Sequence, residues 1–355
     1  MASYPNIPFP DDVPTHPLFI VDFKLIEAKD PFELDKLRQA STNLGFWYLK
    51  NHGAEELVDK MFNIGEDMMD LPLDEKMKWE QGDSGRSFGY KCIGGNAVDE
   101  EGTPDAVEFL NLSKDDILSY PTPTHRTYPS LVNERMTSIV QPFLEISLHV
   151  TNVLIGALND MLGLPAGTLA ALHSKEPPSG SEIRIIKKSP QPGGTEEKAA
   201  ALAAHTDFGS LSFLHNRMGG LQVLVPGNDV WQYIRPIPNH AVCNIGDALK
   251  IFSAGILRSN IHRVMHVSPP GEQRNYNRWS LVYFSRPSNQ VLLRNLADKS
   301  SIIAEALKES EDKFVTDSNA GDWFARRIKN QRLKNRTGPE TWRASRGTEF
   351  NPNLL

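Results

Sequence analysis

The stretch His205-Thr-Asp-Phe-Gly-Ser-Leu211 places a histidine and an aspartate two positions apart. Alternate residues of a β-strand point to the same side, so the side chains of His205 and Asp207 can reach one ion. A third ligand must come from another strand, and His262 in the run Ser259-Asn-Ile-His-Arg-Val264 can supply it. Two imidazoles and one carboxylate leave one face of a metal open, which suits non-haem Fe(II). We therefore predict an iron site built from these three residues.

A second motif, Arg278-Trp-Ser280, follows the third ligand along the chain. On a strand it puts a guanidinium fork and a hydroxyl on one face, which is a good receptor for a carboxylate. The predicted site therefore holds a metal and a carboxylic acid side by side.

Short β-rich runs surround these motifs and are separated by Gly, Pro, Asn and Asp, a pattern typical of a β-sandwich or barrel. The runs are residues 183–186, 211–214, 221–225, 241–245 and 279–284. Upstream, the sequence predicts strands at 18–23 and 46–49, a helix at 31–44 with Asp30 as N-cap, and a helix at 55–69. Apolar residues spaced three or four apart predict a long helix over 131–162, kinked at Pro142.

Taken in order, these motifs resemble the isopenicillin N synthase-like branch of the 2-oxoglutarate- and Fe(II)-dependent oxygenases. The similarity also includes Gly219-Gly-Leu-Gln-Val223, Asn244-Ile-Gly-Asp247 and the upstream runs at 18–23, 45–53 and 71–77, and spans roughly residues 15 to 330. It implies a mixed α/β fold: a double-stranded β-helix (jelly-roll) core with flanking helices and an α/β N-terminal region. The expected divisions are an N-terminal domain at 1–125, a helical segment at 126–178, the jelly-roll core at 179–295 and a C-terminal helical extension at 296–355.

The resemblance also implies an activity, namely hydroxylation, desaturation or oxidative cyclisation of a small molecule, for which we expect a secondary metabolite. Fe(II) would be the metal, 2-oxoglutarate and O2 the co-substrates, and ascorbate the reductant. Arg278 and Ser280 would hold the C5 carboxylate of 2-oxoglutarate. One alternative is an oxidase of the isopenicillin N synthase type, which lacks 2-oxoglutarate but keeps the Arg-x-Ser motif. A remoter one is a non-catalytic jelly-roll binding protein.

The chain departs from the family pattern at two places. Lys188 lies near the position where many relatives have a tyrosine that helps to hold 2-oxoglutarate, so it either donates to that carboxylate or is solvated. Arg184 is not a departure, because relatives often carry a basic residue at this position; it either contacts the iron-bound carboxylate or forms a structural ion pair. The second departure is the interval between His262 and Arg278, which is longer than usual in the family and predicts a loop insertion. This interval also contains His266, which is a rival third ligand. The His-Arg-Val context favours His262.

By family position, several aromatic and polar residues are candidates for the substrate pocket: Phe88, Tyr90, Phe109, Asn111, Lys187, Phe208, Leu211, Phe284 and Trp323. The stretch from Asp322 to Arg346 contains eight basic residues against two acidic ones. We interpret it as a solvated helix packed by its apolar face rather than a nucleic-acid or acidic-membrane patch. A third alternative is that its inner face lines the substrate mouth.

Composition agrees with an ordinary globular enzyme. The net charge of −6 gives no reason to expect nucleic acid as a partner. The two cysteines, Cys92 and Cys243, indicate neither a disulfide framework nor a zinc cluster. The N-terminus has no apolar signal region, and no run reaches the roughly 18–20 apolar residues that a membrane span needs. We expect a cytoplasmic protein, monomeric and not bound to a membrane.

Overall fold

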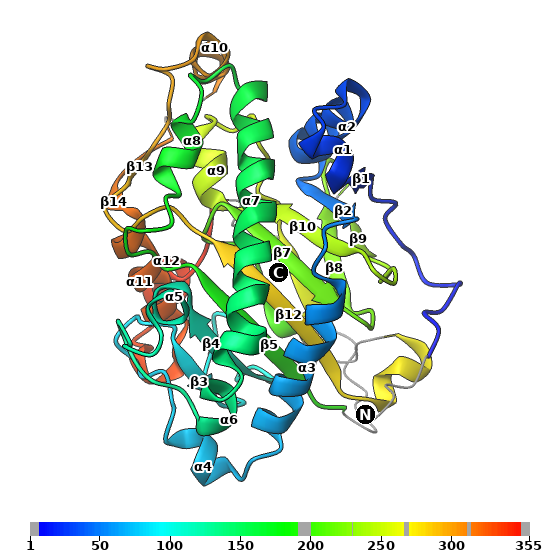
Figure 1. Cartoon of the computed structure of the whole chain (residues 1–355), viewed down its shortest axis with the longest axis vertical. Helices are drawn as coiled ribbons and strands as arrows, with labels where there is room; N and C mark the ends of the chain where they lie inside the picture. The colour runs from blue at the N-terminus through cyan, green and yellow to red at the C-terminus, as the bar shows by residue number, and fades with distance from the viewer. Residues whose placement is uncertain (1–6, 191–199, 229, 266–269, 311–313, 349–355) are drawn as a thin grey trace.

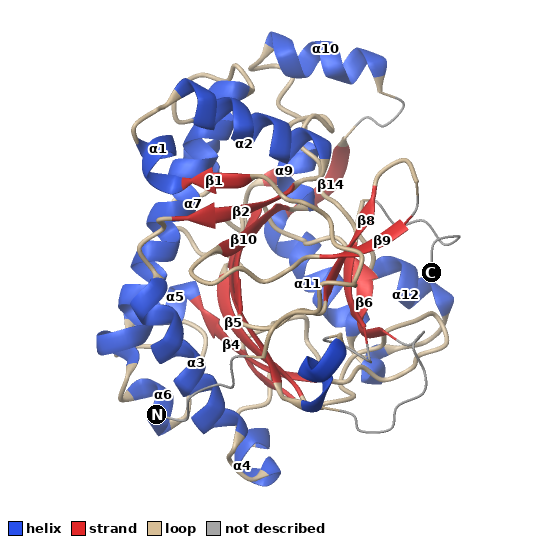
Figure 2. Ribbon diagram, turned by 90° about the vertical axis from the view of Figure 1, so that its right-hand side faces the viewer, coloured by secondary structure: helices blue, strands red, loops and turns tan. Residues whose placement is uncertain are grey.

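A computed structural model describes residues 7–190, 200–228, 230–265, 270–310 and 314–348. Its centre is a pair of facing β-sheets, shown nearly edge-on in Figure 2. Most strand pairs are antiparallel, and only β1 and β2 pair in parallel among the named strands. The arrangement confirms the predicted mixed α/β class.

The larger sheet has eight strands in the order β1-β2-β10-β7-β12-β5-β4-β3. Their bounds are β1 Ile20–Asp22, β2 Phe46–Lys50, β10 Ala241–Ile245, β7 Leu211–Asn216, β12 Arg278–Ser285, β5 Glu182–Lys188, β4 Val107–Ser113 and β3 Gly89–Lys91. Strands from the N-terminal region thus form both edges of this sheet, and strands from the predicted jelly-roll core fill its middle.

The smaller sheet has the order β6-β11-β8-β9. It contains β6 Ala200–His205, β11 His262–Met265, β8 Leu221–Val225 and β9 Val230–Tyr233. A separate two-stranded ribbon joins β13 Leu292–Arg294 to β14 Val315–Asn319. Since β6 and β11 both belong to the smaller sheet, this sheet carries two of the three predicted metal ligands.

Helices cover the outer face of the larger sheet, and α7 crosses it in Figure 1. The α-helices are α1 Phe23–Glu27, α2 Pro31–Asn43, α3 Glu55–Met69, α4 Leu73–Met77, α5 Lys114–Ser119, α6 Ser130–Asn133, α7 Gln141–Met161, α8 Thr168–Leu172, α9 Asp247–Phe252, α10 Ser301–Glu309, α11 Ala320–Gln331 and α12 Pro339–Ala344. Asp30 caps α2 as predicted, accepting from the backbone N–H groups of Phe32 and Glu33. The first strand is shorter than predicted, because Asp22 caps α1 at Phe23.

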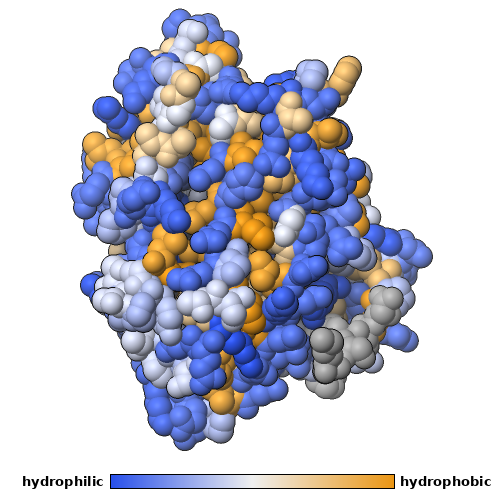
Figure 3. Space-filling view, viewed as in Figure 1, coloured by the Kyte–Doolittle hydropathy of each residue, from blue (hydrophilic) through white to orange (hydrophobic). Residues whose placement is uncertain are grey.

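The long predicted helix is divided. A short helix, α6, is followed by a π-helical turn at Met136–Val140, and α7 starts only at Gln141. The irregularity therefore precedes Pro142, which occupies the first turn of α7, where its missing N–H costs nothing. By length and composition Met136–Met161 could span a membrane. Here, however, α7 buries one side against the core, and hydrophobic residues show between polar ones in the middle of this face (Figure 3).

Strand alternation divides the larger sheet into a core side and a cavity side. On β7, Leu211 and Phe213 belong to the hydrophobic core beneath α7, whereas Ser212 and Leu214 line the cavity between the sheets. The same rule puts Ile183 and Ile185 of β5 in that core. The cavity is therefore built by one face of each strand.

His173, just after α8, is a buried histidine that the fold holds neutral. Its Nδ1–H donates to the carbonyl of Leu169 at 2.7 Å, and its Nε2 accepts from the hydroxyl of Ser210 at 2.6 Å. Burial lowers the pKa of His173 from 6.5 to about 4. The unfolded chain therefore binds more protons here than the folded chain between these two pH values.

We predict that this residue's contribution to stability is complete above pH 6.5 and is lost as the pH falls towards 4. The loss attributable to it is about 3 kcal/mol, since one pKa unit corresponds to about 1.4 kcal/mol. Urea unfolding of the wild type and His173→Gln across this range measures it. The variant should have the flatter profile, and parallel profiles would contradict the prediction.

Candidate metal and co-substrate site

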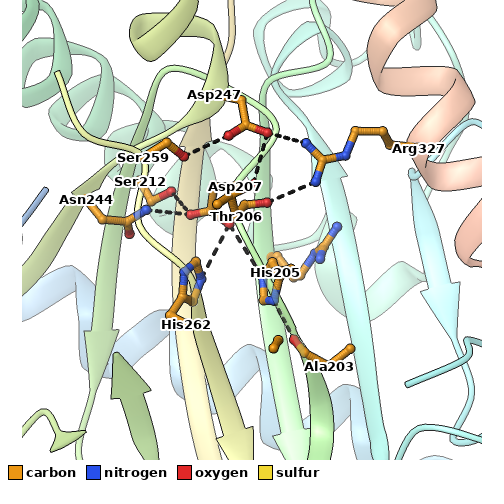
Figure 4. Close-up of polar contacts among 12 residues, drawn as sticks. Ala203, His205, Thr206, Asp207, Ser212, Asn244, Asp247, Ser259, His262 and Arg327 are labelled. Carbon is orange, nitrogen blue, oxygen red and sulfur yellow. Dashed lines mark hydrogen bonds and ion pairs between the residues drawn. The ribbon is translucent and has the colours of Figure 1, made fainter. Parts of the chain in front are cut away.

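The three predicted ligands converge where β6 ends and β11 begins (Figure 4). His262 lies directly opposite His205 in the register of the two strands. The predicted strand does not extend to Asp207, because β6 ends at His205 and Asp207 lies in the loop that follows. Its Oδ1 nevertheless lies 3.7 Å from Nε2 of each histidine. The ligand atoms of all three residues lie within 4.8 Å of one another. This is the only such group among the residues that the structure describes.

Hydrogen bonds fix which atom of each side chain remains available. Nδ1 of His205 lies 2.7 Å from the carbonyl of Ala203, and Nδ1 of His262 lies 3.2 Å from the carbonyl of Asn260. A carbonyl only accepts, so each Nδ1 carries the proton and each Nε2 keeps a lone pair for a metal. Asp207 is held in the same manner, because its Oδ2 accepts from Ser212 and Asn244 while Oδ1 faces the histidines.

The protonation states also suit metal binding. Burial and the neighbouring His262 lower the pKa of His205 to about 3. Burial works to raise the pKa of Asp207, but the two histidines and the hydrogen bonds outweigh it and hold this pKa at about 2. At neutral pH His205 is thus a neutral imidazole and Asp207 a carboxylate, and together with His262 they form the donor set of a non-haem Fe(II) facial triad.

A buried ion pair stands behind the triad. Arg327 of α11 donates to Asp247 at the start of α9, and both side chains are fully buried. Asp247 also accepts from Thr206, which lies between two ligands, and from Ser259, three residues before His262. Thr348, in the C-terminal segment, donates to Asp247 through its hydroxyl and its backbone N–H. One carboxylate therefore joins both ligand loops to the C-terminal region.

Arg278 lines the cavity on β12, as the Arg-x-Ser motif predicted. Its Nη1 donates to the hydroxyl of Ser280 at 2.7 Å, and its Nε donates to the carbonyl of Gly219 at 2.7 Å. The insertion before β12 contains a 3-10 turn at Gly271–Asn275, and its Gln273 accepts from the N–H of Gly219. The insertion thus supports the loop that orients Arg278.

Lys188 lies opposite Arg278 in the register of β5 and β12. It is buried, and no ion pair joins it to an acidic group in the described part of the chain. Burial, and then the charge of Arg278, lower the pKa of Lys188 to about 8. Two like charges at opposed positions repel, so their pairing favours an anion bound between them.

Of the two alternatives that the sequence left open for Arg184, the structure shows the ion pair. Arg184 forms an ion pair with Glu182 at 2.8 Å and donates from Nε to Asn111 at 2.7 Å. Its guanidinium also lies 4.4 Å from the ring centre of Phe109 and borders the cavity.

Three of the nine substrate-pocket candidates line the cavity, namely Phe109, Phe208 and Phe284. The other six lie elsewhere. Phe88 stacks on His125, Tyr90 donates to Glu108, and Asn111 accepts from Arg184. Leu211 and Lys187 are on the opposite face of their strands. Trp323 lies beside Arg326 and Arg327. For Leu211 and Lys187 the reason is strand alternation, because Ser212 and Lys188 take the inner face.

The structure adds residues that sequence reasoning missed. Arg286 on the segment after β12, Asp105 before β4, and Gln331 and Arg346 of the C-terminal region all line the cavity. The basic composition of the C-terminal region was the available signal, and the third alternative, an inner face at the substrate mouth, is the one that agrees with this finding. The rival ligand His266 lies outside the described residues.

Two family models match the chain. That of the 2OG-Fe(II) oxygenase superfamily matches residues 181–287. That of the N-terminal region of the non-haem dioxygenases in morphine synthesis matches residues 18–134. The first includes all three ligands and the Arg-x-Ser motif.

Curated relatives match most of the chain. A 2-oxoglutarate-dependent dioxygenase of Gibberella zeae is 25% identical over 321 residues, covering 89% of this chain and 88% of that protein. One of Aspergillus fumigatus is 27% identical over 347 residues, covering 90% and 88%. A 1-aminocyclopropane-1-carboxylate oxidase of Dictyostelium discoideum is 25% identical and covers 82% and 88%.

Solved structures share the fold. A full-length protein of Neurospora crassa, crystallised in complex with alpha-KG, superposes with a TM-score of 0.71 at 21% identity, covering 90% of this chain and 97% of that one. The dioxygenase for auxin oxidation 1 of Arabidopsis thaliana gives a TM-score of 0.63 at 22% identity, covering 79% and 97%.

We predict that Asp207→Ala weakens Fe(II) binding by more than about 100-fold and leaves the fold intact, because the site loses its only anionic ligand. Anaerobic calorimetry of Fe(II) binding measures this, with circular dichroism as the check on folding. Ser212→Ala removes one hydrogen bond to Oδ2 and should have a smaller effect, about 10-fold or somewhat more. Parental iron affinity in Asp207→Ala would show that the ligand set is different.

The buried ion pair gives a separate prediction. Arg327→Met should lower the free energy of unfolding by about 3–5 kcal/mol, because Asp247 then keeps a buried charge without its cation. Adding Asp247→Asn should recover part of the loss. The neighbouring Arg326 provides the control, since Arg326→Met should change stability by less than about 0.5 kcal/mol. Additive effects of the two buried substitutions in urea unfolding would contradict this coupling.

Proposed function

Because the chain belongs to the 2OG-Fe(II) oxygenase superfamily, we propose that His205, Asp207 and His262 bind the catalytic iron and that Arg278 receives 2-oxoglutarate. The protein is a 2-oxoglutarate- and Fe(II)-dependent oxygenase, an oxidoreductase that uses O2. The observation that carries the residue assignment is the convergence of three ligand atoms beside a buried arginine.

The protein's own part is to hold and orient the reactants. His205, Asp207 and His262 would hold the iron from one side, and the cavity that they line would receive the other reactants. With iron, 2-oxoglutarate and O2 bound, such a site converts 2-oxoglutarate to succinate and CO2 and removes a hydrogen atom from a substrate C–H bond. Hydroxylation, desaturation and cyclisation share that removal, so the outcome depends on how the cavity places the substrate.

Lys188 and Arg278 are the proposed receptor for the C5 carboxylate, with Ser280 orienting the guanidinium. This receptor supports dependence on 2-oxoglutarate over the oxidase alternative, which the Arg-x-Ser motif alone does not exclude. A buried lysine opposed to a buried arginine favours a bound anion, and the distal carboxylate of a dicarboxylic acid supplies one.

We assign the protein to secondary metabolism, acting on a small molecule as a cytoplasmic monomer. Support comes from the fungal dioxygenases among its relatives and from structural neighbours that hold small molecules such as thymine. The cavity wall, which includes Phe46, Phe109, Phe208 and Phe284, suits a substrate with an apolar skeleton.

The co-substrate assignment is tested with Arg278→Lys. Lysine keeps the charge but loses the fork, so the apparent KM for 2-oxoglutarate should rise about 10- to 100-fold. Succinate formation with Fe(II) and ascorbate over a range of 2-oxoglutarate concentrations measures it. If the wild type turned over at the same rate without 2-oxoglutarate, the oxidase alternative would be favoured. An unchanged KM for 2-oxoglutarate in Arg278→Lys would indicate that another residue binds the carboxylate.

Lys188 gives an independent prediction. Lys188→Met should weaken 2-oxoglutarate binding at least about tenfold and spare iron, whereas Lys188→Tyr should recover part of the loss through its phenolic hydroxyl. Lys187→Met is the matched control, because Lys187 lies on the other face of β5 beside Glu108. Anaerobic titration of the iron complex measures these affinities. Equal values for Lys188→Met and the wild type would exclude Lys188 from the receptor.

A further inference from the structure

The C-terminal segment brings a second cation to the cavity. Arg346 follows α12 and is only 6% exposed. Its guanidinium lies 3.7 Å from the ring centre of Trp342, and its Nη1 donates to the carbonyl of Ala204 at 2.7 Å. Ala204 precedes His205, so Arg346 borders the cavity beside the metal site, against the smaller sheet.

Arg346 has no acidic partner in the described part of the chain. Its hydrogen bonds go to the carbonyl of Ala204 and the hydroxyl of Ser345, both neutral groups. By contrast, Arg327 pairs with Asp247, and Arg184 and Arg286 share Glu182. Burial, and then the charge of Arg327, lower the pKa of Arg346 to about 9, so it stays charged at neutral pH. A buried charge without a counterion is costly, which indicates that a ligand supplies one.

The charged residues that line the cavity also favour a bound anion. Four arginines and two aspartates line it. Asp207 belongs to the metal site, and Asp105 is paired with the buried Lys91. When the C5 carboxylate of 2-oxoglutarate binds Arg278, the other side chains that line the cavity still carry a net positive charge.

The two cations lie on different walls. Arg278 belongs to β12 of the larger sheet and contacts Gly219, whereas Arg346 is fixed to β6 of the smaller sheet. Arg346 donates to the carbonyl of Ala204, the residue before the ligand His205, so it lies beside the triad. A second anion therefore has its own receptor, apart from the one for the C5 carboxylate.

We propose that the substrate is a carboxylic acid whose carboxylate binds Arg346, with its apolar skeleton against Phe109, Phe208 and Phe284. The inference rests on the proposed function, because it takes the cavity beside the triad as the substrate site. Arg346 acts as a specificity-determining residue, and the ion pair it forms fixes which C–H bond faces the metal.

The test uses aromatic and aliphatic monocarboxylic acids, each matched with its methyl ester. Binding to the anaerobic Fe(II)–2-oxoglutarate complex is measured by calorimetry, and substrate-dependent succinate formation is measured in air. The wild type should bind the best acid at least about tenfold more tightly than its ester. Arg346→Gln should remove this preference and leave the Kd of 2-oxoglutarate unchanged, whereas Arg346→Lys should keep part of it.

Arg343→Gln is the control for added disorder in this segment, since Arg343 is exposed and pairs only with Glu100 among the acidic groups that the structure describes. It should bind acids as the wild type does. Equal binding of acids and esters, or an acid preference that survives in Arg346→Gln, would overturn the proposal. A rise in the Kd of 2-oxoglutarate in Arg346→Gln would overturn it too, by assigning Arg346 to the co-substrate. Failure of the wild type to bind 2-oxoglutarate would instead reject the proposed function.

Discussion

The buried carboxylate of Asp247 is the interaction on which the site's geometry depends. It accepts from Thr206 between two ligands, from Ser259 ahead of the third, and from Arg327 and Thr348 of the C-terminal region. Removing one partner of such a buried charge is strongly destabilising. The metal loop, the approach to β11 and the C-terminal segment are therefore ordered together. The tight fit at Gly347 agrees with this, because a Cβ there would overlap the hydroxyl of Thr206.

The two sheets set the orientation of the three ligand side chains. The register of β6 and β11 sets His205 opposite His262, and backbone carbonyls fix the protonated nitrogen of each ring. Because these partners are main-chain atoms, ring orientation depends little on neighbouring side chains. Asp207 is held by side chains from β7 and β10 of the other sheet, so the triad also joins the two sheets.

Charge is distributed unevenly within the cavity. Co-substrate recognition is assigned to the strand pair β5 and β12, whose opposed Lys188 and Arg278 suit a distal carboxylate. Arg346 is delivered from the other direction by the C-terminal segment. The proposed metal and co-substrate receptors therefore lie mainly on the strands, whereas the proposed specificity residue lies on the C-terminal segment.

The sequence by itself determined many of the elements and the local motifs. Helices α2 and α3 and strands β5, β7, β8, β10 and β12 follow from capping and periodicity, which are local properties. The candidate residues His205, Asp207 and His262 and the Arg-x-Ser pair follow from sequence motifs and their spacing. Only the tertiary structure decided which side chains share the cavity. Phe88, Tyr90 and Asn111 contact His125, Glu108 and Arg184 instead of lining the cavity. Arg346 lines the cavity although it lies far from His205 in the sequence. The neighbours of a side chain across such a separation depend on how whole segments pack, and no local pattern encodes that.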